Sequence, residues 1–182
     1  MHVEAIQETI HDNHCIGCGP DNPRGLRIRS FWCGDLETMC SFQPEPHMAA
    51  AHPAVLNGGV IATLIDCHAV CTAISYAERL AGGGGAGEAS FATASLDVRY
   101  RHPAPIDQPV QVHAKIIGVG ERKTVLECTL TSAGRVCAEA TVVAVRVAHE
   151  WPDRPQRIQF PIQCLGGWRR PSTAPTSVTK TT

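Results

Sequence analysis

Asp66 lies within an apolar run, residues 56–74, whose leucine at position 56 is followed by Asn57, Gly58 and Gly59. A carboxylate among apolar side chains costs several kcal/mol to desolvate unless a partner or a reaction uses its charge. Asn is a preferred N-cap, so we expect a helix to start here, with unpaired backbone amides at its positive end. Such amides stabilise an oxygen that gains negative charge, and a carboxylate activates water or attacks directly. These residues therefore predict attack on a carbonyl group.

The spacing supports a shared site. Asp66 follows Gly59 by seven residues, nearly two helical turns, so both fall on about the same face of the helix. The neighbours that we expect to desolvate the carboxylate are Ile61, Leu64, Ile65 and Val70. The alternative is a structural aspartate whose charge is satisfied by a hydroxyl such as Thr63 or by a neighbouring strand.

The remaining elements follow from hydrophobic periodicity. The helix would continue to about Leu80, spanning roughly 36 Å, and its apolar residues on every side indicate a buried helix. Alternation with period two predicts six strands. They lie at residues 26–32, 36–42, 90–100, 110–120, 124–132 and 135–147.

The order of these elements predicts an α+β fold, in which a six-stranded antiparallel sheet covers one face of the long helix. Because the other face of the helix and the edge of the sheet stay uncovered, we expect a partner subunit to cover them. We expect an N-terminal lead-in over residues 1–23, one domain over 24–148, and a largely disordered tail over 149–182, which is rich in Pro, Ser and Thr.

Composition narrows the classes of function. A net charge of −1 on 182 residues leaves no electrostatic footprint for nucleic acid. Asp66 and His68 break the longest apolar run, so we expect no membrane span, and the acidic N-terminus does not resemble a secretory signal. The nine cysteines are odd in number and mostly sit singly in apolar patterns, typical of reduced thiols. We expect a cytosolic protein.

Three motifs accompany this order of elements: GGVIATLID at 58–66, CGPDNPRGLRIRSF at 18–31 and TASLDVRYRHPAP at 93–105. With them the chain resembles the hotdog-fold acyl-CoA thioesterases, in particular the phenylacetate-pathway (PaaI-like) branch of the 4-hydroxybenzoyl-CoA thioesterase superfamily. The resemblance implies Asp66-assisted attack of water on an acyl-CoA thioester whose carbonyl is held by the amides of Gly58 and Gly59. It also implies a homodimer or a dimer of dimers, with active sites at the subunit interface, and no cofactor.

Two further residues enter through the resemblance. Counting back from Pro103 places Thr93 where the family has a hydroxyl that positions the water; an ordinary strand threonine is the alternative. Asn57 stands where the family has a histidine, and an amide caps a helix and donates a hydrogen bond but is neither acid nor base. This departure keeps open a non-catalytic hotdog protein that binds acyl-CoA or another small ligand.

Coenzyme A carries phosphates, so we expect basic groups at the rim of the site. The candidates are Arg99, Arg101, Arg122 and Lys123, with His52 as a candidate for the acyl pocket. Solvated surface charges and a surface loop histidine are the alternatives.

Cys15 and Cys18 form a Cys-x-x-Cys pair, with His11 and His14 just before it. Nitrogen and sulfur ligands of this kind bind zinc, but all four fall within eight residues instead of two separated pairs. The family resemblance implies that such a Cys-x-x-Cys-Gly-Pro entry is a turn, so we expect no metal, with zinc as the alternative.

Overall fold

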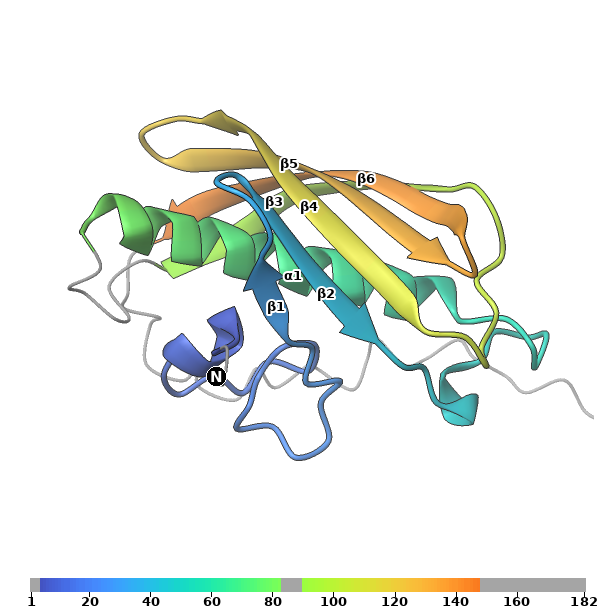
Figure 1. Ribbon diagram of the computed structural model, residues 1–182. Coiled ribbons are helices and arrows are strands. Elements are labelled where there is room, and N and C mark those ends of the chain that lie inside the picture. The colour runs from blue at the N-terminus through green and yellow to red at the C-terminus, as the bar shows by residue number, and fades with distance from the viewer. Residues whose placement is uncertain (1–3, 83–89, 148–182) are drawn as a thin grey trace, which may run out of the picture. The chain divides into compact units, whose positions relative to one another are not determined.

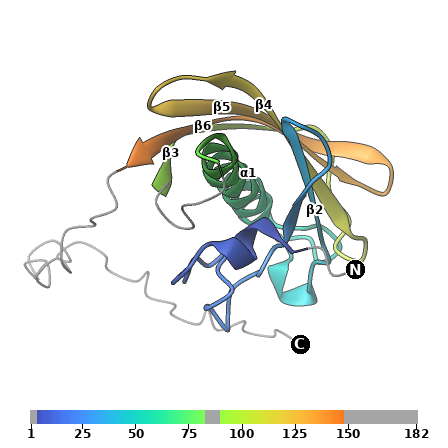
Figure 2. The same ribbon diagram turned by 60° about the vertical axis from the view of Figure 1, so that its left-hand side comes forward.

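The computed structural model describes residues 4–82 and 90–147. One antiparallel sheet of six strands curves around a single long helix, α1 (Gly58–Leu80), as Figures 1 and 2 show from two sides. The strands are β1 (Ser30–Trp32), β2 (Glu37–Phe42), β3 (Ser90–Tyr100), β4 (Val110–Val119), β5 (Lys123–Ser132) and β6 (Arg135–Val147). Short 3-10 helices, η1 (Ile6–Thr9) and η2 (Pro46–Met48), precede α1. The predicted fold class is confirmed.

The strand order is β1-β2-β4-β5-β6-β3, so β1 and β3 are the edges of the sheet within residues 4–82 and 90–147. Every neighbouring pair is antiparallel. The four strands after the helix lie within one residue of their predicted bounds. The predicted tail, residues 149–182, lies outside the described residues.

The helix α1 joins the core through one side. Leu64 and Ile65 are fully buried and cluster with sheet residues such as Val112 and Leu126. By length and composition α1 could cross a membrane, with a mean hydropathy of 1.5, but half of that window is buried inside this fold. A core helix passes the same test, so length and hydropathy are weak evidence for a span.

The expectation that α1 is buried on every side is wrong for the single chain. Gly59 is exposed, and Ala62, Asp66 and Val70 are only half-buried. Spaced by three or four residues, these positions form one stripe along the helix, which we call the open stripe. Asp66 is therefore more accessible to water than its apolar neighbours in the sequence predicted.

The first predicted strand starts four residues too early. Arg27 has a φ of +53°, and the amides of Leu26 and Ile28 donate to the carbonyls of Ile16 (2.7 Å) and Gly17 (3.1 Å). Residues 26–28 thus pair with the Cys-x-x-Cys loop instead of β2. The sequence does alternate here, but alternation does not indicate which segment a stretch of backbone pairs with.

A buried network of hydrogen bonds links α1 to η1, β1 and β2. His68 on α1 lies between Ser30 (Nδ1 to Oγ, 2.7 Å) and Thr38 (Nε2 to the carbonyl oxygen, 3.3 Å). Gln7 donates to Ser30 Oγ at 2.8 Å, and Thr38 and Thr72 share a 2.6 Å hydroxyl bond. Since a carbonyl only accepts, Nε2 carries the proton and Nδ1 accepts from Ser30. Burial lowers the pKa of His68 to about 4, so the ring is neutral.

Candidate active site

Asp66 and Thr93 meet on the open side of the helix. Thr93 Oγ1, from edge strand β3, donates to Asp66 Oδ1 at 2.5 Å. The hydroxyl satisfies one carboxylate oxygen and leaves Oδ2 for another donor. Because Thr93 is exposed and Asp66 is half-buried, water can reach the pair.

A β-bulge aims Thr93 at the helix. Thr93 pairs with Ala144 and Ser95 with Val143, so Ala94 is the extra residue in β3. Leu96 packs against the core, and strict alternation from it would turn Thr93 to the outer face. One inserted residue reverses that alternation, and Thr93 then faces Asp66.

The start of α1 forms a second feature. Asn57 Oδ1 accepts a 2.7 Å hydrogen bond from the Gly59 amide, the N-cap that the sequence predicted. The Tyr100 hydroxyl donates to the Gly58 carbonyl at 2.7 Å. In this state the cap engages the Gly59 amide, so Gly58 presents the amide that the cap does not use.

A cavity of about 360 Å³ opens beside this helix start. Its lining is mainly apolar and comes from Ala50, Val55, Leu56, Gly58, Ile61, Tyr100, Arg101, His102, Pro103 and Ala104. Leu56 N donates to the Ala104 carbonyl and Asn57 N to the Met48 carbonyl, both at 2.9 Å. These bonds fix the first turn of α1 against the cavity wall.

Within one chain the two features are separate. Gly58 and Asp66 are eight positions apart, which is about 12 Å along a helix. A water that a base activates must also touch the carbonyl carbon, so base and oxyanion donor must lie only a few ångströms apart. Within one chain, Asp66 and the Gly58 amide are therefore too far apart to act on the same carbonyl group.

The structure scatters the predicted substrate-binding residues. Arg101 lines the cavity and pairs with Glu139 at 2.7 Å, whereas Arg99 lies near Asp97 at 3.9 Å, beside another hollow in the sheet. His52 is exposed in the loop before α1 and does not line the cavity; its Nδ1 accepts from Ala54 N at 3.3 Å.

Arg122 and Lys123 do lie together, and Arg146 of β6 joins them. The three line a hollow of about 520 Å³ with Val145 and Val147, and we call them the basic corner. Val145, the partner of Lys123, follows Ala144, the partner of Thr93, so the corner is at the Thr93 end of the sheet. Sequence reasoning missed Arg146 because only the pairing of β5 with β6 brings it there.

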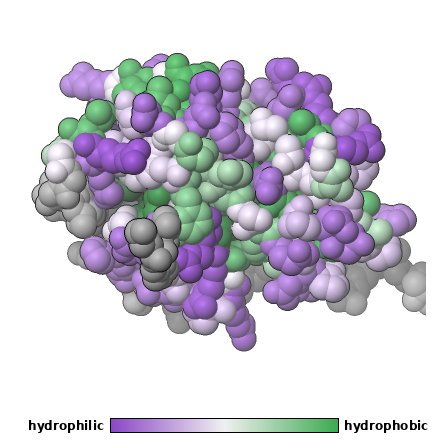
Figure 3. All heavy atoms as spheres, viewed as in Figure 1, coloured by the Kyte–Doolittle hydropathy of each residue, from purple (hydrophilic) through white to green (hydrophobic). Residues whose placement is uncertain are grey.

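Exposed apolar side chains adjoin this corner. Ile117 and Val119, near the tip of the β4–β5 hairpin, are 50% and 53% exposed. Figure 3 shows apolar residues gathered at its upper left, where Figure 1 has this tip. The tip thus offers both apolar and cationic surface to a ligand.

Comparisons with known proteins agree with this architecture. A family model described as Thioesterase superfamily matches residues 54–139, from before α1 into β6. A crystal structure of a Thioesterase superfamily protein from Shewanella loihica PV-4 is 33% identical, covering 66% of this chain and 90% of that one, with a TM-score of 0.52.

Two more distant similarities extend the picture. Acyl-coenzyme A thioesterase THEM4 of Rattus norvegicus is 28% identical over 117 residues, which are 64% of this chain but only 45% of that protein. The chain thus spans about half the length of this relative. A hypothetical thioesterase protein with coenzyme A from Streptococcus pneumoniae TIGR4 shares the fold, with a TM-score of 0.55 at 15% identity, covering 66% of this chain and 86% of that one.

The similarity to the Shewanella protein establishes the family, because the two sequences are 33% identical and the match covers 90% of that chain. The chain therefore belongs to the thioesterase superfamily.

Proposed function

We propose that this protein is an acyl-CoA thioesterase of the PaaI-like branch, in which Asp66 drives water onto the thioester carbonyl. The observation that carries the proposal is that Asp66, held by Thr93 at one carboxylate oxygen, lies on the open stripe where water can reach it. The names of its relatives support the same class of reaction, since the rat protein is named an acyl-coenzyme A thioesterase and the Shewanella protein a Thioesterase superfamily protein.

The proposed reaction combines the Asp66–Thr93 pair with the start of α1. Asp66 Oδ2 accepts a proton from water while Thr93 holds Oδ1, and the water oxygen bonds to the carbonyl carbon. The resulting oxyanion is stabilised by the Gly58 amide at the positive end of α1. The carbon–sulfur bond then breaks, and the proton held by Asp66 leaves with the coenzyme A thiolate. Gly59 would add a second donor if the Asn57 side chain moved away.

The proposal requires two copies of the chain. About 12 Å separate Asp66 from Gly58 along one helix, so a single site must combine Asp66 and Thr93 of one copy with the helix start of another. Strand β3 is an edge of eleven residues in the described chain, and long unpaired edges favour pairing with another strand. We infer a homodimer, or a dimer of dimers, that pairs through β3.

The substrate would span two surfaces. The apolar cavity beside Gly58 suits an acyl chain or the pantetheine arm, and the basic corner suits the phosphates of coenzyme A. The coenzyme A in the Streptococcus pneumoniae thioesterase structure supports this substrate class.

The test is Asp66→Asn. This substitution keeps the side-chain volume but removes the base, so release of coenzyme A should fall by at least about a hundredfold. Asp35→Asn, in an exposed turn, is the matched control and should retain the wild-type rate. An Asp66→Asn protein that elutes as the wild-type oligomer and turns over at the wild-type rate would exclude the mechanism.

A second candidate is a non-catalytic protein that binds acyl-CoA or a similar ligand. The bond from Gly59 N to Asn57 Oδ1 favours it, because the cap occupies an amide that the reaction could use. A panel of aromatic, short and long acyl-CoA substrates separates the two functions. Turnover of any member supports the enzyme, whereas calorimetric binding without turnover supports the binding protein.

A further inference from the structure

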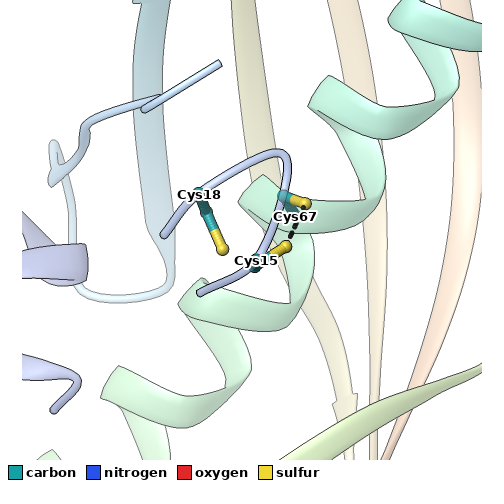
Figure 4. A group of neighbouring side chains, drawn as sticks. All are labelled: Cys15, Cys18 and Cys67. Carbon is teal, nitrogen blue, oxygen red and sulfur yellow. Dashed lines mark hydrogen bonds between the residues drawn. The ribbon is translucent and has the colours of Figure 1, made fainter. Parts of the chain in front are cut away.

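Three cysteines from two distant segments meet over the middle of α1, and a fourth, Cys71, follows along the helix. The loop at residues 13–19 lies on the helix and brings Cys15 and Cys18 to Cys67 (Figure 4). The three sulfur atoms lie within 4.8 Å of one another, and Cys15 Sγ is 3.5 Å from Cys67 Sγ. Cys71 follows Cys67 by one helical turn, and its thiol interacts with that of Cys18.

This grouping supplies what the sequence pattern lacked. Zinc sites typically use two separated pairs of ligands, and here Cys15-x-x-Cys18 faces Cys67 and Cys71 at i and i+4 of a helix. Among the described residues, the side chains close enough together to share a metal ion are Cys15, Cys18 and Cys67. The structure does not bring His14 to it; that side chain is exposed and pairs with Asp12 at 3.0 Å.

The loop is shaped around the sulfur atoms. Gly17 N donates to Cys15 Sγ at 3.4 Å, and Asn13 Nδ2 donates to Cys18 Sγ at 3.6 Å. A Cβ atom on Gly17 would overlap Cys67 Sγ, so only glycine allows this approach. Donors of this kind orient metal-binding thiolates and tune their charge.

The separations fit a metal better than a disulfide. Sulfur atoms bound at about 2.3 Å in a tetrahedral zinc site lie about 3.8 Å apart. The 3.5 Å separation of Cys15 and Cys67 is close to this value, whereas a disulfide needs about 2.0 Å. Cys18, Cys67 and Cys71 are at most 7% exposed, so an ion here would be shielded from water.

We propose that Cys15, Cys18, Cys67 and Cys71 bind one Zn²⁺ ion, which fastens the N-terminal loop to α1 beside Asp66. Soft thiolates select zinc over magnesium or calcium, and four of them leave no open position for substrate. The ion is thus structural, and the thiol protons pass to solvent on binding. This site is independent of the proposed thioesterase activity.

The experiment measures metal content in the full chain. Protein expressed in zinc-supplemented medium and purified without chelator should contain about one zinc per chain, the stoichiometry of a closed site with four cysteine ligands. Replacing zinc with Co²⁺ should produce the thiolate-to-cobalt charge-transfer band and the visible bands of tetrahedral cobalt. Cys18→Ser and Cys67→Ser should lose both signals, and the chelated wild-type protein should melt at a lower temperature.

Matched controls separate the cluster from other thiols. Cys33→Ser, which is exposed, and Cys137→Ser, which is buried elsewhere, should keep full zinc content. Asp66→Asn should also keep it, so loss of activity and loss of metal are distinguishable. The Co²⁺ titration of reduced, zinc-free wild-type protein needs no variant and holds even if a serine variant misfolds. Absence of cobalt binding there, retention of zinc in Cys18→Ser, or a disulfide found by mass spectrometry would overturn the proposal.

Discussion

At the scale of single residues, some polar groups at the start of α1 hold the helix in place and one is left for a ligand. The Asn57 side chain holds the Gly59 amide, and Tyr100 holds the Gly58 carbonyl. Both bonds fix the first turn, and neither uses the Gly58 amide. The Gly58 N–H is thus the donor best placed for an oxyanion.

Proline tests that amide directly. Gly58 is the first helical residue, where proline is favoured, and Asn57 already has the extended backbone that precedes proline (φ −63°, ψ 135°). Gly58→Pro should keep the helix but lower the rate of hydrolysis by about a hundredfold, the usual cost of losing an oxyanion donor. Steady-state assays and circular dichroism measure the two effects.

Gly58→Ala is the matched control. Its Cβ would lie 3.3 Å from the Tyr100 ring, a contact that proline also makes, yet the amide remains. Equal losses in both variants would assign the effect to crowding against Tyr100 and contradict the role of the amide.

The sequence predicted part of this site. The Asn57 cap and the helix start follow from local preferences that act within a few residues, and the structure agrees with both. The side of the sheet that Thr93 faces could not be predicted from alternation, because the extra residue Ala94 reverses the alternation. Nothing in this sequence indicates the bulge. Arg146 was missed because it reaches Arg122 only through strand pairing.

At the scale of elements, the buried network around His68 decides how the N-terminal half is held. The ring joins α1 to β1 through Ser30 and to β2 through Thr38, and Gln7 adds the residues of η1. A protonated ring would lose Nδ1 as an acceptor, and its charge would be buried. The attachment of β1 and β2 to the helix therefore depends on a neutral His68.

This dependence predicts a loss of stability in mild acid. The pKa of His68 is about 4 in the folded protein, because burial disfavours the charged ring, against 6.5 when unfolded. Between pH 6.5 and pH 4 only the unfolded chain binds this proton, so stability is full above pH 6.5 and falls as pH drops towards 4. The total loss is about 3 kcal/mol. Urea unfolding across this range measures it, and His47→Gln, an exposed histidine, should not change the trend. An NMR titration of His68 near pH 6.5 would contradict it.

Sequence patterns predicted the elements well where each strand pairs within the sheet. Period-two alternation located β3 to β6, because one face of each meets the core. It failed at residues 26–29, where the alternating side chains belong to an extended loop. The backbone of this loop pairs with that of Ile16 and Gly17. Alternation reports burial of one face, and it does not distinguish a strand from an extended loop.

At the scale of the whole molecule, the proposed dimer would cover two surfaces that the described residues leave open. The open stripe of α1 carries Asp66, and β3, which carries Thr93, is a sheet edge. A second copy pairing along β3 would cover the stripe and place its own helix start near Asp66. One twofold axis would therefore satisfy the edge, cover the helix and complete two equivalent sites.

A mixed dimer tests this arrangement without a structure of the complex. Asp66→Asn and Gly58→Pro chains can be co-expressed with different tags, and the mixed dimer isolated by two affinity steps. If each site takes Asp66 from one copy and Gly58 from the other, one site has both defects and the other has none. The mixed dimer should then show about half of the wild-type rate, since one of two symmetric sites is intact. If each site lay within one chain, both sites would be defective and the mixed dimer would be as inactive as either parent.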